Sequence, residues 1–168
     1  HKNNILTAGG AEDDNVLVVL FDRTGQRGAH YKLGWDSVTD RTSENVVKRL
    51  SVMNDIAERH LVTASKDVSV AGIAGTAAMM LEYSGKGGII DLDLIDRARP
   101  KNVALEDWLR MYISLGFLVA TKEEDFLDLK QVANEHDLSA CRIGSVDDTR
   151  KVKLSMSGES LVMFDFTK

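Results

Sequence analysis

The sequence has one cysteine, one proline and no long apolar run, and each scarcity excludes a class of protein. Cys141 alone cannot form an internal disulfide or a cysteine-based zinc site, so we expect a reducing compartment, the cytoplasm. The longest apolar run, Val16–Phe21, is far shorter than the roughly 20 residues that cross a bilayer. No positively charged leader precedes an apolar segment near His1. The sequence therefore predicts a soluble protein with no membrane partner.

Positive charge is also scarce. The chain has 21 Lys and Arg against 26 Asp and Glu, a net charge of −5, and its basic residues are scattered among acids. No basic stripe of the kind that binds a phosphate backbone is visible, so nucleic acid is not an expected partner. His30, His60 and His136 lack metal-ligand spacing, which indicates surface or helix-end histidines and no metal site.

The residues that are present suit a single globular domain. A chain of 168 residues, 43% hydrophobic and 28% charged, has the size for one core. No composition break marks a second domain, and we expect the ordered core to span about residues 15–166. The chain begins with His1 instead of methionine, and we expect it to be part of something longer.

Strand and helix patterns alternate along the chain. The β-branched run Val16–Phe21 predicts a strand buried on both faces. Residues 25–41 show no steady period and are interpreted as irregular. Helices are predicted over about 42–57, 70–83, 103–114 and 121–137, and further strands over 88–92, 116–121, 140–146, 152–156 and 161–166. This order predicts an α+β fold in which helices cover one or both faces of a mixed, partly antiparallel sheet.

Local side chains refine these helices. The first helix carries an apolar stripe that is expected to face the core and includes Val46, Val47 and Leu50. Each of three helix starts offers side chains able to cap it: Thr42 or Ser43, Asp67 or Ser69, and Thr121 with Glu124.

The most informative stretch is Asp-Val-Ser-Val-Ala-Gly-Ile-Ala-Gly-Thr, residues 67–76. Gly72 and Gly75 lie in the first two turns of a predicted helix, where missing side chains would let a ligand reach backbone N–H groups. A helix N-terminus carries roughly half a positive charge, so a phosphate would be stabilised there. Alternatively, the small residues only let the helix pack closely on the sheet. On the first interpretation, Gly72→Val weakens anion binding before it unfolds the domain.

Two further constellations have two interpretations each. Trp35 and Asp36 lie in the irregular stretch, where they could stack on and hydrogen-bond a ligand, or where the tryptophan could anchor the loop on the core. Asp91 and Asp93 alternate along a predicted strand, either as a carboxylate pair or as solvated edge acids.

Four short motifs, taken in order, resemble the C-terminal domain of the aminoimidazole ribonucleotide (AIR) synthase and selenophosphate synthetase superfamily. They are the Asp67–Gly75 stretch, the Ile89–Ile95 segment before Arg99-Pro100, the glycine-led Ser114–Ala120, and Ile143-Gly144-Ser-Val146. Their spacing matches over about Val16 to Phe166. The Trp35-Asp36-Ser37 sequence is also similar to AIR-synthase-related proteins of the methanogenesis marker protein 2 type. Thr76 departs from selenophosphate synthetases, which often have histidine there, so substrate identity does not transfer.

The resemblance implies a three-layer α/β/α domain and an incomplete enzyme. In such proteins an N-terminal domain, absent from this chain, carries most residues for ATP and Mg²⁺, and a cleft between the domains receives ATP and a second substrate. The catalytic residues are therefore unknown, and no cofactor is expected on this chain alone. By this resemblance the phosphate-binding residues would be Lys66, as a counter-charge, with Asp67, Ser69, Gly72, Gly75 and Thr76. The expected partners are a phosphate-containing small molecule, the N-terminal domain and a second copy in a homodimer. The alternative is a non-catalytic interaction module that uses residues 25–41.

Overall fold

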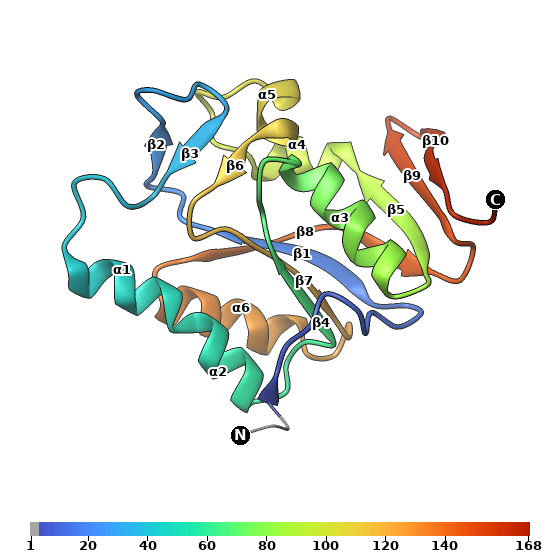
Figure 1. Ribbon diagram of the computed structural model, residues 1–168, viewed down its shortest axis with the longest axis horizontal. Helices are drawn as coiled ribbons and strands as arrows, with labels where there is room; N and C mark the ends of the chain where they lie inside the picture. The colour runs from blue at the N-terminus through green and yellow to red at the C-terminus, as the bar shows by residue number, and fades with distance from the viewer. Residues whose placement is uncertain (1–3) are drawn as a thin grey trace.

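The computed structural model describes residues 4–168 and has three layers, with a mixed sheet between two layers of helices (Figure 1). The central sheet has seven strands in the order β10-β9-β5-β8-β1-β7-β4. All neighbours in it are antiparallel except β5 and β9, which run parallel. The strands are β1 Val16–Phe21, β4 Ala64–Asp67, β5 Gly87–Asp91, β7 Phe117–Thr121, β8 Ser139–Asp147, β9 Lys151–Met156 and β10 Glu159–Asp165. The predicted α+β class and the three-layer arrangement are confirmed.

A second, three-stranded sheet lies at one end of the molecule, beside the short helix α5 (Figure 1). Its strands are β2 Gln26–Arg27, β3 Gly34–Asp36 and β6 Tyr112–Ile113. The helices are α1 Ser43–Leu50, α2 Val52–Glu58, α3 Gly72–Tyr83, α4 Leu92–Ala98, α5 Leu105–Arg110 and α6 Phe126–Glu135. Within residues 4–168, no helix is both long enough and apolar enough to span a bilayer.

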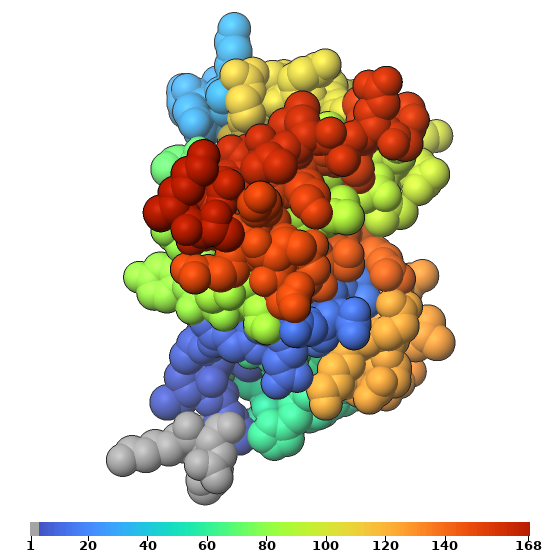
Figure 2. Space-filling view, turned by 90° about the vertical axis from the view of Figure 1, so that its right-hand side faces the viewer, coloured from blue at the N-terminus to red at the C-terminus, as the bar shows by residue number. Residues whose placement is uncertain are grey.

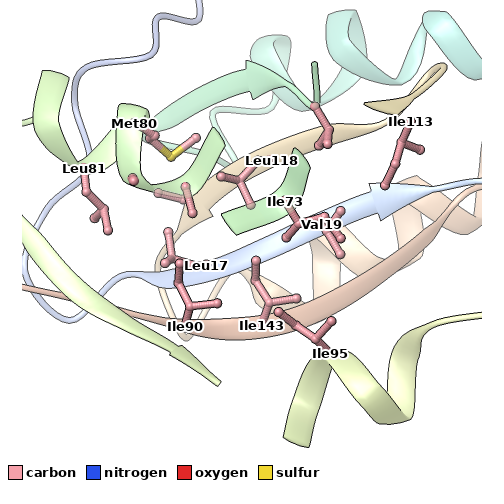
Figure 3. Packing of buried hydrophobic residues seen from close by; sticks show 14 of the residues in the cluster. Leu17, Val19, Ile73, Met80, Leu81, Ile90, Ile95, Ile113, Leu118 and Ile143 are labelled. Atoms are coloured by element: carbon pink, nitrogen blue, oxygen red, sulfur yellow. The ribbon is translucent and has the colours of Figure 1, made fainter. Parts of the chain in front are cut away.

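Strand β1 divides the core into two parts, as its continuous apolar sequence predicts. Leu17, Val19 and Phe21 point to the layer of α3, α4 and α5, whereas Val16, Val18 and Leu20 point to α2 and α6. Figure 3 shows the first part, in which Ile73 and Met80 of α3 reach toward the strands. Every residue of β1 is buried because successive side chains alternate between two covered faces.

Helix α1 corrects the predicted apolar stripe. Val47 and Leu50 are 63% and 52% exposed, whereas Arg49 is only 5% exposed. The Arg49 Nε lies 3.3 Å from the carboxylate of Asp22, which is itself 1% exposed at the end of β1. A buried carboxylate requires a partner charge, and this ion pair holds the Arg49 side chain of α1 inward. The predicted single helix is also divided at Ser51 into α1 and α2.

The expectation that Asp91 and Asp93 alternate along one strand is also wrong. Asp91 ends β5 and caps α4, where its carboxylate accepts a hydrogen bond from the Leu94 amide at 3.0 Å. Asp93 lies within α4 and accepts from the Ser157 amide at 2.7 Å. Because a helix begins at Leu92, the two residues do not alternate along one strand.

Two predicted helix caps are absent. Neither Asp67 nor Ser69 caps α3, which begins after Ala71 with no side-chain cap. Thr121 is buried in β7, where its hydroxyl donates to the Leu61 carbonyl at 2.7 Å, and α6 begins later, after Asp125. The predicted cap of α1 is confirmed, since Thr42 accepts from the Asn45 amide.

Candidate functional site around the β4–α3 loop

The predicted anion site corresponds to the loop between edge strand β4 and helix α3. Lys66 and Asp67 end β4, a short strand that the sequence did not predict. The Asp67 side chain is 67% exposed, and the Lys66 amine lies 3.6 Å from it. Ser69 is half-buried, and Val70 and Ala71 are exposed. The loop therefore presents one carboxylate, one amine and one hydroxyl next to the start of a helix.

Gly72 has a packing role in this loop. Its φ is +68°, a left-handed conformation that favours glycine. A Cβ built on Gly72 would overlap the Leu109 carbonyl oxygen and stand 2.6 Å from the Arg110 Cα. Its amide donates to the Ser69 carbonyl at 2.9 Å, so it is not available to an anion. The expectation that Gly72→Val weakens binding before folding does not fit this geometry, because position 72 has no room for a side chain.

Gly75 and Thr76 lie on different sides of α3. Gly75 lines an apolar hollow of about 270 Å³ between α3 and the stacked rings of Phe164 and Phe166. Thr76 is completely buried, and its hydroxyl has no hydrogen-bond partner among the described residues. Of the six predicted binding residues, Lys66 and Asp67 pair at the end of β4, Ser69 lies half-buried in the loop that follows, and Gly72 and Thr76 are buried.

Trp35 anchors its loop on the core. It is 2% exposed, its indole N–H donates to the Asp22 carbonyl at 2.8 Å, and its ring packs edge-on against Trp108. The Asp36 carboxylate accepts from the amides of Val38 and Thr39 at 2.9 Å each. The Thr39 hydroxyl, together with these two amides, lowers the pKa of Asp36. The structure therefore supports the anchoring interpretation for Trp35 and gives Asp36 a turn-forming role.

Two tyrosines that the sequence did not single out line a hollow together with Trp35 and Asp36. Tyr31 and Tyr112, 49% and 40% exposed, lie on the loop before β3 and on β6. The helix predicted over residues 103–114 included Tyr112, but α5 ends at Arg110 and Tyr112 belongs to a strand. The position of Tyr31 between Gly28 and Gly34 was the only sequence signal for it.

The remaining candidates have structural roles. His136 forms the C-terminal end of α6, as predicted, and contacts the Asp55 carboxylate at 2.7 Å. Burial raises the pKa of the Cys141 thiol, although the Arg23 guanidinium at 3.2 Å opposes this shift. Among residues 4–168, no group of three or more His, Cys, Asp or Glu is placed to hold a metal ion.

The chain is a three-layer α/β/α domain, because its mixed sheet lies between two layers of helices. Helix α3, which begins at Gly72, follows the edge strand β4. Residues 12–157 match the family described as AIR synthase related protein, C-terminal domain, and the chain belongs to that family. The resemblance that the four motifs indicated is thereby confirmed.

Relatives by sequence are longer proteins. An uncharacterised protein of Methanocaldococcus jannaschii is 30% identical over 167 residues, which cover 99% of this chain and 51% of that protein. The phosphoribosylformylglycinamidine synthase subunit PurL of Natronomonas pharaonis is 30% identical over 174 residues, covering 96% of this chain and 24% of the subunit. The chain thus spans about half the length of the first relative and about a quarter of the second.

Solved structures show the same fold at low sequence identity. The PurLQS structure from Thermotoga maritima has a TM-score of 0.77 at 14% identity, over 96% of this chain and 27% of the matched chain. The hydrogenase maturation protein HypE, solved in complex with ATP, has a TM-score of 0.65 at 15% identity, over 97% of this chain and 54% of that one. T. maritima PurL has also been solved with ADP, with ATP and with FGAR.

Proposed function

We propose that this chain is the substrate-side domain of an ATP-dependent AIR-synthase-related enzyme and that it binds a phosphate or another oxyanion at the β4–α3 loop. Membership of the AIR synthase related family supports the first part. The ATP-bound and FGAR-bound relatives support a reaction that uses a nucleotide and a second substrate. On this proposal the domain binds and orients the substrate, and it does not catalyse the reaction alone.

One observation carries the anion assignment. Helix α3 has twelve residues and begins at an exposed loop with neither a side-chain cap nor an acidic residue in its first turn. The first N–H groups of a helix lack intrahelical acceptors, and the aligned peptide dipoles make that end positive. Since no side chain among residues 4–168 caps this end, an anion can accept from the first amides that follow Gly72.

The predicted residues then have different roles. Lys66 supplies a positive charge near the loop, and Ser69 supplies a hydroxyl. Gly72 lets the loop turn directly against α5, so it positions the helix end without contacting the ligand. Thr76 supports the second turn of α3 from the buried side.

ATP and Mg²⁺ are assigned to the part of the longer protein that lies outside this chain. The described residues include no group of three or more side chains that could bind Mg²⁺, and Asp67 is a single exposed carboxylate. We therefore assign no step to a metal on this chain. A cytoplasmic location and a homodimer remain predictions from the composition and from the resemblance.

The proposal is tested by titrating the 168-residue chain with phosphate, sulfate and ATP while its backbone amide resonances are recorded. Amides of residues 69–76 are expected to shift and saturate with each anion, and chloride at matched ionic strength is the control. A silent loop, or shifts spread evenly over the surface, would contradict the anion assignment.

The alternative is a non-catalytic interaction module that uses residues 25–41. The exposure of Tyr31 and Val38, 49% and 41%, favours it. An upstream domain with clustered aspartates in the parent reading frame would favour the enzyme, whereas an unrelated sequence there would favour the module.

A further inference from the structure

A hollow of about 500 Å³ lies beside the three-stranded sheet, apart from the β4–α3 loop. The segment of residues 28–33 projects from the top of the molecule next to α5, where Figure 2 shows it in light blue beside yellow. The aromatic walls come from Tyr31 on this segment, Trp35 on β3 and Tyr112 on β6. Two stretches of chain, residues 26–39 and 112–114, therefore line the hollow.

The walls favour a flat, uncharged group. Lysine and arginine are both missing from the residues that line the hollow, and its surface is mainly carbon. Its one carboxylate, Asp36, already accepts from the amides of Val38 and Thr39. Tyr31 and Tyr112 are about half exposed, so part of each ring can contact a ligand. Aromatic rings gain most from stacking on other flat rings. The size also falls within the roughly 300–1,000 Å³ that is usual for small-molecule sites.

The rim adds a few polar groups. The Ser114 hydroxyl accepts from the Ser37 amide at 2.8 Å and donates to the Trp35 carbonyl at 3.0 Å, so it is already paired. Gln26 and His30 are exposed at the edge and can reach a ligand. Such a rim suits the nitrogen and oxygen atoms of a heteroaromatic ring.

The hollow adjoins the β4–α3 loop through β6. Tyr112 is followed by Ile113, whose amide donates to the Val68 carbonyl at 3.2 Å, and Val68 directly precedes Ser69. Gly72, at the other end of the loop, packs against the backbone of α5, which leads into β6. The hollow and the loop are therefore connected by the hydrogen bond between β6 and Val68.

We propose that the hollow between Tyr31 and Tyr112 binds the planar ring of a phosphorylated heteroaromatic ligand whose phosphate lies at the β4–α3 loop. The ring site rests on the tyrosine walls, and the link to a phosphate rests on the proposed function. The substrate class that follows is a phosphate ester or nucleotide with a flat, uncharged ring.

The ring site is tested with probes that carry no phosphate: phenol, indole and adenosine. Each is titrated into the 168-residue chain while the aromatic resonances of Tyr31 and Tyr112 are recorded, and saturable shifts are expected. Tyr112→Ala is expected to weaken binding about fivefold or more, since base stacking on aromatic side chains has this size, whereas Tyr112→Phe keeps it. Tyr83→Ala removes a tyrosine that is 78% exposed at the far end of α3, and it should leave binding unchanged. Tyr31→Ala repeats the test from another segment if Tyr112→Ala does not fold.

A second titration separates this inference from the proposed function. Adenosine 5′-monophosphate should bind about tenfold tighter than adenosine, because its two parts are linked, and inorganic phosphate should reduce that gain. If adenosine binds at the tyrosines but the monophosphate gains nothing, the ring site stands and the phosphate link fails. If phosphate shifts residues 69–76 but no ring probe moves Tyr31 or Tyr112, the ring site is overturned and the proposed function stands.

Discussion

Gly72 lies so close to the carbonyl of Leu109 that a side chain at position 72 has no room. This contact fixes the start of α3 against α5, and the left-handed φ of Gly72 directs the loop toward that contact. The glycines of the Asp67–Gly75 stretch are therefore not equivalent. Gly72 is required by the backbone, whereas a Cβ at Gly75 would crowd only the Ala71 Cβ, at 2.9 Å.

The first prediction compares alanine at these two glycines. Gly72→Ala should lower the free energy of unfolding by at least about 2 kcal/mol, because it adds left-handed strain to a backbone clash. Gly75→Ala should change it by less than about 1 kcal/mol, because the helical preference of alanine offsets the crowding. Urea denaturation measures both. Equal losses at the two positions would show that Gly72 has no special packing role.

The second prediction concerns the buried pair of Asp22 and Arg49. Asp22→Asn should cost about 3–5 kcal/mol of unfolding free energy, because it leaves the buried Arg49 charge without an opposite charge beside it. Combining it with Arg49→Met should recover part of the loss, because the stranded charge is then gone. A double variant that is less stable than Asp22→Asn would contradict this account.

This pair shows where sequence patterns succeed and fail. The six apolar residues of β1 predicted a strand buried on both faces, because only a strand covered on both sides is apolar at every position. The α1 stripe failed because Asp22, more than twenty positions earlier in the chain, attracts Arg49 inward, and helical periodicity contains no information on such a distant partner. Strand β4 was missed because Ala64–Asp67 is short, polar and at the sheet edge.

The candidate site, too, could be predicted from the sequence only in part. The glycine-rich stretch could be located from sequence, because glycines near a helix start are rare enough to need a reason. The structure was needed to separate Gly72, which packs on α5, from Lys66 and Ser69 at the loop surface. Tyr31 and Tyr112 come together only through the pairing of β3 with β6, which no local pattern contains.

The third prediction concerns His136, which joins α6 to the α1–α2 junction. Its Nδ1 lies 2.6 Å from the Lys48 carbonyl, which can only accept, so Nδ1 carries a hydrogen. Its Nε2 lies 2.7 Å from the Asp55 carboxylate. His136→Ala should therefore lower the free energy of unfolding by about 1–3 kcal/mol.

The matched control for His136 is His30→Ala, at an exposed loop position, which should change stability by less than about 0.5 kcal/mol. Thermal denaturation at pH 7 compares the two variants. A His136→Ala protein as stable as His30→Ala would show that the contacts of His136 contribute nothing.

The fourth prediction follows from the lowered pKa of Asp36, which has its main causes in the hydroxyl and amide of Thr39. An aspartate in the unfolded chain has a pKa of about 3.9. The stabilisation by Asp36 is therefore present above that pH and is lost as the pH falls through the lower pKa of the folded state. The difference in unfolding free energy between wild type and Asp36→Asn should be constant from pH 6 to 8 and shrink below pH 4. A difference that grows on acidification would contradict this assignment.

The most direct test of the central claim is the affinity of inorganic phosphate for wild type, Ala71→Gln and Ala71→Glu, measured from the amide resonances of residues 69–76. Ala71 is exposed and immediately precedes α3, so a carboxylate there would repel an anion without disturbing the core. We expect Ala71→Gln to bind phosphate as wild type does, because glutamine is not a favoured N-cap residue, and Ala71→Glu to bind it about tenfold more weakly. Equal affinity in all three proteins, or no saturable binding in wild type, would contradict an anion site at the β4–α3 loop.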